Sequence, residues 1–320
     1  MKNATNFQLS SMNRREFFLL TAGMCASMFP LRPQFTSLFL KLENFYSSRE
    51  KALRTAQNKE SNTQEIFHKI IKKAKGEEWQ SLPIGECMGN IALFLIGTEY
   101  VAGTLEGEGP EICRIDLTGL DCVTFFENVL CISRILKKEK TSFDDFRAEI
   151  IFTRYRAGIL TDYTSRLHYT SDWIYDNEKK KVVRNITKEI GGEEFPFKVS
   201  FMSKNPQYYQ ALKESPEFIE TIADFEKEIN KRQHWYIPKS KLREAQKYIQ
   251  TGDIIALATD KEGLDYGHTG LIYQDKKGKI RFLHASLENK KVLLDTELYK
   301  YTQSVETHIG ITVARPLEVK

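Results

Sequence analysis

The sequence predicts an α+β fold in which helices come first and an antiparallel sheet follows. In the first half, apolar side chains recur at helical spacing, most clearly after Cys122, as on the buried side of a helix. In the last quarter, short apolar runs between turn residues are typical of strands. Helices followed by strands favour an α+β architecture.

The predicted strands are short and close together in sequence. The tripeptide Lys276-Lys277-Gly278 separates two of them and predicts a hairpin turn. We therefore expect adjacent antiparallel strands at this point. The strand segments are residues 254–258, 270–273, 280–283 and 308–313.

The predicted helices occupy most of the chain before residue 250. The segment 85–96 should end at Gly97 as a C-cap, and Thr141 or Ser142 should cap the segment 143–155. Residues 156–200 lack a clear period and are expected to be irregular and rich in aromatic residues. The other helical segments are residues 64–74, the segment after Cys122, 206–230 and 239–249.

Composition limits the classes of protein to be considered. The chain has 320 residues, and 41% of them are hydrophobic. This content suffices for a hydrophobic core, so we do not expect an intrinsically disordered protein. The net charge of +4 is too weak to indicate nucleic acid as a partner. The five cysteines show neither a disulfide framework nor zinc-ligand spacing, so no metal or cofactor is expected. We expect a monomer.

The N-terminus predicts export. Asn13-Arg-Arg-Glu-Phe-Phe18 resembles a twin-arginine motif, and the apolar stretch that follows to Pro30 is shorter than the ~20 residues of a membrane-spanning helix. We interpret residues 1–30 as a signal-like segment for the periplasm or cell envelope, and 31–60 as a linker or loose helix. Met24 makes a poor lipoprotein box before Cys25, so a lipid anchor is not expected there. The alternative is an uncleaved tail.

Cys122 is the candidate nucleophile. It follows Leu117-Thr-Gly-Leu-Asp121 and opens an apolar helical stretch, so it should lie in the first turn of a buried helix. The positive end of the helix dipole should favour the thiolate, which is the nucleophilic form. Cys87, Cys113 and Cys131 are interpreted as ordinary small buried residues.

Two histidines on the predicted hairpin are candidates for the base and its partner. His268 begins one predicted strand and His284 ends the next. Neighbouring strands can bring these two positions together. One imidazole can then accept the thiol proton, while the other fixes its tautomer as the third member of a triad does. His68, His234 and His308 are interpreted as structural.

These motifs together resemble a known family. Asp121-Cys122, Thr251-Gly-Asp-Ile-Ile255, His268-Thr-Gly-Leu-Ile-Tyr273 and Leu283-His-Ala-Ser286 occur in the order found in NlpC-type cell-wall peptidases. The resemblance implies a papain-like fold, with the nucleophile helix packed on an antiparallel sheet and with helical insertions. It also implies a Cys-His-polar triad.

A narrower resemblance is to the bacterial N-acetylmuramoyl-L-alanine amidase-like family, over roughly residues 65–316. It rests on the segments ending at Tyr100 and Phe125 and on those around residues 154–173. Val123-Thr124 replaces the Ser-Gly that is common after Asp-Cys, and Glu99 replaces the proline before Tyr100. The first departure fits the narrower family. We assign residues 61–320 to one amidase domain with a specificity insertion around 155–235.

The insertion begins with a cluster of rings and arginines that we assign to substrate binding. Arginine can clamp a carboxylate, and aromatic faces can pack on sugar carbons. The alternative is a core cluster around Trp173, with the arginines ion-paired to Asp162 and Asp172. The substrate-binding candidates are Tyr100, Asp121, Tyr155, Arg156, Tyr163, Arg166, His168, Tyr169 and Trp173.

The expected activity is metal-free hydrolysis of an amide in peptidoglycan. The resemblance points to the bond between N-acetylmuramic acid and L-alanine. Three alternatives remain open: an endopeptidase that cuts between D-glutamate and diaminopimelate, a module that binds wall fragments without cutting them, and an acyltransferase.

Overall fold

The computed structural model describes residues 58–319. The predicted signal-like segment 1–30 and nearly all of the predicted linker 31–60 lie outside the described residues. The chain divides into Met1–Asn58 and Lys59–Lys320, and the fold below is that of the second unit. In the part of the chain that the structure describes, no helix has both the length and the apolarity to cross a membrane.

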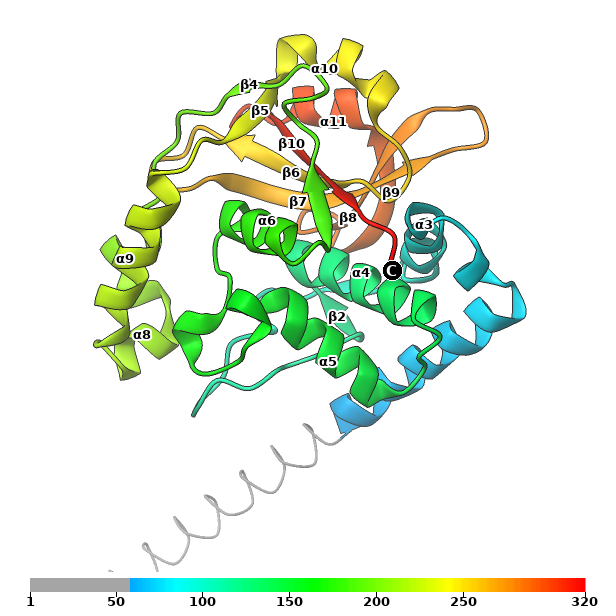
Figure 1. Ribbon diagram of the computed structural model, residues 1–320, viewed down its shortest axis with the longest axis horizontal. Helices are drawn as coiled ribbons and strands as arrows, with labels where there is room; N and C mark the ends of the chain where they lie inside the picture. Colours follow the sequence, from blue (N-terminus) through cyan, green and yellow to red (C-terminus); the bar gives the residue numbers. More distant parts are fainter. Residues whose placement is uncertain (1–57, 320) are drawn as a thin grey trace, which may run out of the picture. The chain divides into compact units, whose positions relative to one another are not determined.

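A large mixed sheet lies at the centre of the unit (Figure 1). The strands follow the order β2-β1-β9-β8-β7-β6-β10-β5-β4, and β3 pairs with β10. The pairings from β8 through β10 are antiparallel, as predicted, and β9 adds a further antiparallel partner to β8. The strands are β1 (Glu99–Tyr100), β2 (Gly119–Leu120), β3 (Val183–Asn185), β4 (Glu193–Glu194), β5 (Trp235–Pro238), β6 (Ile254–Thr259), β7 (Tyr266–Gln274), β8 (Ile280–Ser286), β9 (Lys291–Glu297) and β10 (His308–Pro316).

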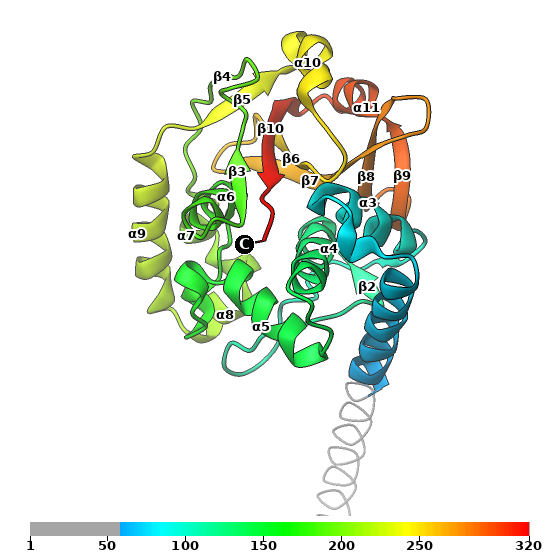
Figure 2. The same ribbon diagram turned by 45° about the vertical axis from the view of Figure 1, so that its right-hand side comes forward.

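Helices cover both faces of the sheet (Figures 1 and 2). The face toward α3 and α4 buries Ile254, while the face toward α10 and α11 buries Ile255. This explains why β6 is an uninterrupted apolar run: a strand that is covered on both sides has no polar face. After a helix over residues 58–76, the helices are α3 (Ile84–Phe94), α4 (Cys122–Lys137), α5 (Phe143–Arg154), α6 (Thr170–Lys179), α7 (Phe201–Lys204), α8 (Gln210–Glu214), α9 (Phe218–Asn230), α10 (Lys239–Ala245) and α11 (Leu298–Ser304).

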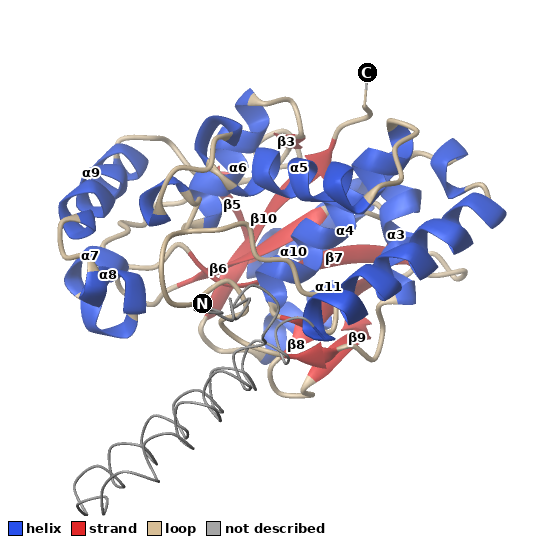
Figure 3. Ribbon diagram, turned by 90° about the horizontal axis from the view of Figure 1, so that it is seen from below, coloured by secondary structure: helices blue, strands red, loops and turns tan. Residues whose placement is uncertain are grey.

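The segment predicted as a specificity insertion contains a small core of its own. Tyr163 and Tyr169 pack there with apolar residues of α7, α8 and α9. Figure 3 shows these three helices grouped at one end of the unit, far from α3. The segment thus extends the main fold at one end, and its role in specificity stays a prediction.

Several elements differ from the sequence-based expectation. Residues 156–200 were expected to be irregular, yet they contain α6 and β3, because α6 buries Asp172, Asp176 and Asn177 beside its few apolar residues and so shows no apolar period. Strand β9 was not predicted, since only Val292 of its residues is buried. Helix α3 ends at Phe94 rather than at residue 96. Ser142 caps α5, one of the two residues that the sequence predicted for this cap, and Asp121 caps α4.

Candidate catalytic site

A capping box fixes Cys122 as the first residue of α4. The Asp121 carboxylate accepts hydrogen bonds from the backbone N–H groups of Val123 and Thr124, and the Thr124 hydroxyl accepts one from the Asp121 N–H. Such a box satisfies donors that would otherwise be unpaired at a helix start. The half-buried thiol of Cys122 is therefore held at a defined helix terminus.

A contact from β7 brings the start of α4 next to His268. The Thr269 hydroxyl donates to the carbonyl oxygen of Cys122 at 2.9 Å. Thr269 is the residue after His268, so the nucleophile candidate and the base candidate lie beside the same stretch of strand. The pairing of β6 with β7 also shifts register between Leu257 and Ala258, next to His268. Bulges of this kind redirect side chains and are frequent beside active sites.

The hairpin joins the two predicted histidines as the sequence led us to expect. His268 Nε2 lies 2.7 Å from His284 Nδ1, and the two rings are nearly perpendicular at 83°. Gly270 makes room for this pair, because a Cβ at that position would lie 2.8 Å from the Cβ of His284. His284 is buried at 1% exposure, so its second nitrogen also needs a partner within the protein.

That partner is Asp295, which the sequence analysis did not select. His284 Nε2 lies 3.3 Å from Asp295 Oδ2 on β9. Tyr301 of α11 was also missed. Its ring packs 4.9 Å from the His284 ring and 6.3 Å from the His268 ring, measured between centroids. Neither residue belongs to a recognisable motif, and β9 itself carried no strand signal.

The electrostatics correct one expectation about Cys122. Burial, together with the Asp121 carboxylate, raises the pKa of the Cys122 thiol to about 11, although the Thr269 hydroxyl and N–H act in the opposite direction. With this pKa the resting group at neutral pH is a thiol rather than the expected thiolate. Burial, with smaller effects of His284 and His308, lowers the pKa of His268 to about 3. At neutral pH the site therefore holds a thiol and a neutral imidazole that can accept a proton.

Of the predicted substrate-binding residues, Tyr100 and Asp121 lie beside the nucleophile. Burial raises the pKa of Tyr100 to about 12, and the nearby Cys122 and Asp121 contribute to the rise. Asp121 is engaged as the cap of α4. The substrate-binding role of both residues stays a prediction, since their placement alone does not test it.

The insertion residues gather in space, but around very little room. Arg156, Arg166, His168 and Tyr169 line a cavity of about 10 Å³, enough for a single water molecule. Arg156 is ion-paired with Asp172 at 2.7 Å. Arg166 is ion-paired with Glu106 at 2.7 Å, and Tyr163 packs beside it. These arginines have carboxylate partners already, as in the alternative interpretation, although Asp162 caps a turn instead of pairing with arginine.

Trp173 and Tyr155 lie in the interior. The Trp173 indole donates to Glu127 at 3.0 Å, and its ring meets Phe126 edge-on at 5.0 Å. The Tyr155 hydroxyl donates to Glu111 at 2.8 Å. For these two residues the structure shows the core cluster that was the alternative to substrate binding.

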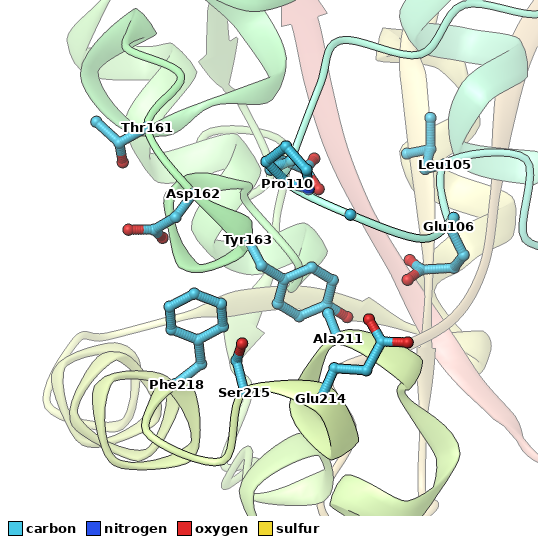
Figure 4. Close-up of a pocket in the computed structure, with 13 residues that line it drawn as sticks. Leu105, Glu106, Pro110, Thr161, Asp162, Tyr163, Ala211, Glu214, Ser215 and Phe218 are labelled. Atoms are coloured by element: carbon cyan, nitrogen blue, oxygen red, sulfur yellow. The ribbon is translucent and has the colours of Figure 1, made fainter.

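A larger cavity of about 310 Å³ lies between the loop after β1 and helices α8 and α9 (Figure 4). Four acidic residues are among its lining residues: Glu106, Glu111, Asp162 and Glu214. Tyr163 is the one predicted site residue among its lining residues, and none of Cys122, His268 and His284 is among them.

Comparison with known proteins identifies the family. Residues 90–311 match the family described as N-acetylmuramoyl-L-alanine amidase-like, and the chain belongs to it. The fold and site thus define an amidase-like protein with a role related to peptidoglycan. Among curated proteins, none matches this chain.

Several solved structures are similar to this chain, and one of them is named as an amidase of this kind. The chain is similar to an N-acetylmuramoyl-L-alanine amidase from Bacteroides uniformis ATCC 8492, with 32% identity, a TM-score of 0.69, and coverage of 73% of this chain and 99% of that one. It is also similar to a candidate xylanase from Bacteroides fragilis, with 34% identity, a TM-score of 0.67, and coverage of 71% and 99%. A protein from Legionella pneumophila shares the fold at 22% identity, with a TM-score of 0.59 and coverage of 83% and 96%.

Proposed function

We propose that this protein is a cysteine amidase that hydrolyses the amide between N-acetylmuramic acid and L-alanine in peptidoglycan fragments. The observation that carries the proposal is the pair of imidazoles of His268 on β7 and His284 on β8, 2.7 Å apart, together with the hydrogen bond from Thr269, the residue after His268, to the carbonyl oxygen of Cys122. The family supplies the choice of bond.

In the proposed reaction, the neutral His268 accepts the proton of the Cys122 thiol as sulfur attacks the carbonyl carbon. The C–N bond then breaks, and His268 gives this proton to the leaving amine of L-alanine. Water, deprotonated by His268, then attacks the thioester carbonyl, the C–S bond breaks, and His268 returns the proton to the Cys122 sulfur. The products are the lactyl carboxylic acid and the regenerated thiol.

The developing oxyanion needs donors close to the sulfur. At the start of α4, the backbone N–H groups of Val123 and Thr124 are already engaged, because the Asp121 carboxylate accepts from both. The Cys122 N–H is the first-turn donor that remains for the substrate. The Tyr100 hydroxyl, whose phenol lies near Cys122, is the second donor that we propose.

We also propose the wider NlpC-type, papain-like assignment and export to the periplasm or cell envelope. The first is supported by a nucleophile helix that packs on an antiparallel sheet carrying both histidines. The second is supported by the twin-arginine-like residues 13–18. We propose a monomer that uses neither nucleic acid nor a metal.

Mass spectrometry of defined muropeptides incubated with the pure protein tests the reaction. The amidase should release the free sugar and an intact stem peptide. A shortened stem would instead identify an endopeptidase, and unchanged substrate would leave a binding module. Product that forms only with an added amine acceptor would identify an acyltransferase.

The Cys122→Ala variant should lose turnover and keep fragment binding. Cys113→Ala is the matched control, because Cys113 is also partly buried but lies outside the site. If the Cys122→Ala variant keeps full activity, Cys122 is not the nucleophile and the proposal is wrong.

A further inference from the structure

We infer that Asp295 is a positioning residue of the site: by accepting a hydrogen bond from the Nε2–H of His284, it holds that imidazole in the one tautomer that lets His268 act as a base. The reacting groups would then form a chain of four members, Cys122, His268, His284 and Asp295. This inference rests on the proposed cysteine amidase reaction, but its central claim about proton positions can be tested without turnover.

The carboxylate of Asp295 is held in a defined orientation. Asp295 Oδ1 accepts a hydrogen bond from the backbone N–H of Thr296 at 2.6 Å, and the backbone carbonyl oxygen of Asp295 accepts one from Arg281 Nε at 2.6 Å. Only Oδ2 faces the His284 ring, at 3.3 Å. The strand and its neighbour thus fix which oxygen meets the imidazole.

The His284 ring is held equally firmly. It stacks on Phe282 with centroids 4.6 Å apart and an angle of 22°. It also meets Tyr301 edge-on and is 1% exposed. A ring so enclosed cannot turn to water for a partner, so its two nitrogens must be satisfied by His268 and Asp295.

The proton positions follow from these contacts. A neutral imidazole has one N–H donor and one acceptor nitrogen, and an ionised carboxylate only accepts. His284 Nε2 therefore carries the proton that goes to Asp295, and His284 Nδ1 accepts from His268 Nε2. This leaves His268 Nδ1 with a free lone pair for the thiol proton. In the opposite arrangement His268 Nδ1 carries a proton and cannot serve as a base.

Replacement of Asp295 by asparagine gives an unusual expectation. The Thr296 N–H, which now binds Oδ1, would hold the amide oxygen of the new side chain in the same place. The amide NH₂ would then point at His284 Nε2 and force that nitrogen to accept. Both imidazoles would reverse, and His268 would lose its basic nitrogen. The isosteric Asp295→Asn should therefore harm the enzyme more than Asp295→Ala, which a merely structural role would not produce.

Nitrogen-15 NMR of the histidine rings tests the tautomers in the intact protein. The wild type should show protonated Nε2 at both His268 and His284, and Asp295→Asn should show protonated Nδ1 at both. Glu297→Gln is the matched control, because Glu297 lies on the same strand but pairs with Lys279 and Lys300 instead of a histidine. Wild-type tautomers in the Asp295→Asn variant would overturn the inference, whether or not the protein proves to be an amidase.

Kinetics on muropeptides provide the second readout. Asp295→Ala should lower kcat about 10- to 100-fold with little change in KM, as for other outer partners of reacting groups. Asp295→Asn should lower kcat further, toward the about 10⁴-fold loss seen when an orienting carboxylate becomes an amide. Equal losses in both variants, or a loss matched by Glu297→Gln, would reduce Asp295 to a structural role.

The acid limb of the pH profile should move as well. The titratable groups packed around the histidine pair are Asp295 on β9, Tyr301 on α11, His308 on β10 and Cys122 on α4. Of these, Asp295 raises the pKa of His284. In Asp295→Ala the limb should therefore shift to lower pH while the plateau falls, and an unmoved limb would count against the inference.

Discussion

Gly270 offers a direct test of how the strand makes room for the histidine pair. In Gly270→Ala the new Cβ would lie 2.6 Å from Phe282 Cζ and 2.8 Å from the Cβ of His284, both closer than packed atoms allow. Gly267→Ala on the same strand is the control, because its nearest neighbour would be 3.5 Å away, an ordinary contact.

The magnitude follows from two opposing effects. Overpacking a buried site costs about 1–3 kcal/mol. Removing a glycine from a strand gains about 0.5–1 kcal/mol in conformational entropy. The net destabilisation of Gly270→Ala is therefore up to about 2.5 kcal/mol, or up to about 10 °C in Tm for a domain of this size. Gly267→Ala should leave Tm unchanged or raise it slightly.

Activity should separate the two variants more sharply than stability. The Phe282 ring and the Cβ of His284 must both move to admit the new methyl group, so the 2.7 Å contact between the histidines lengthens and kcat falls. A misplacement of about 1 Å can cost about 100-fold in rate. Thermal unfolding and muropeptide turnover of both variants provide the assay. If Gly270→Ala matches Gly267→Ala in Tm and kcat, the close approach does not constrain the site as we argue.

Three further predictions concern protonation. Burial raises the thiol pKa of Cys122 to about 11, so the rate of alkylation of Cys122 by iodoacetamide should rise about tenfold per pH unit from pH 7 to 9. The rate is measured by mass spectrometry of the Cys122 peptide. A rate that does not change with pH would indicate a resting thiolate instead. Asp121→Asn removes the carboxylate that helps raise this pKa but keeps a capping side chain. Alkylation of Cys122 at pH 8 should therefore be faster than in the wild type, with a nearly unchanged Tm. Asp121→Ala should also lose about 1 kcal/mol of stability, because it removes the cap. The pKa of His268 is about 3 in the folded protein and about 6.5 in the unfolded chain, so between these pH values the unfolded protein binds one more proton. The free energy of unfolding should therefore fall as the pH drops below 6.5, by up to about 1.4 kcal/mol per pH unit for this group. In His268→Gln the urea midpoint should fall less steeply with decreasing pH than in the wild type.

Strands β6, β7, β8 and β10 and the start of the nucleophile helix were predictable because their signals are local. Continuous apolar runs such as 254–258, and a cap followed by a helical stripe at Asp121-Cys122, follow from short stretches of sequence. Strand β9 and helix α6 were not predictable in this way. Their residues are only partly buried or are buried as polar groups, so no apolar period marks them.

The candidate site divides along the same line. Cys122, His268 and His284 each stand in a recognisable motif, and the predicted hairpin already suggested that the two histidines meet. Asp295 and Tyr301 have no motif, and only the pairing of β8 with β9 and the packing of α11 bring them to His284. In the insertion, the sequence suggested a site that the structure does not show as open. A run of rings and arginines suggested a pocket, but the guanidinium groups of Arg156 and Arg166 are ion-paired with Asp172 and Glu106.

The sequence by itself determined the strands β6, β7, β8 and β10, the start of the Cys122 helix, the identity of the nucleophile and base candidates, and the family. These depend on side-chain type and spacing, which the chain carries wherever it folds. Only the tertiary structure decided the protonation of Cys122 and the partner of His284. A pKa reflects the solvent and charges that surround a group, and a hydrogen-bond partner reflects which strands become neighbours. Both are properties of the folded arrangement rather than of any one segment.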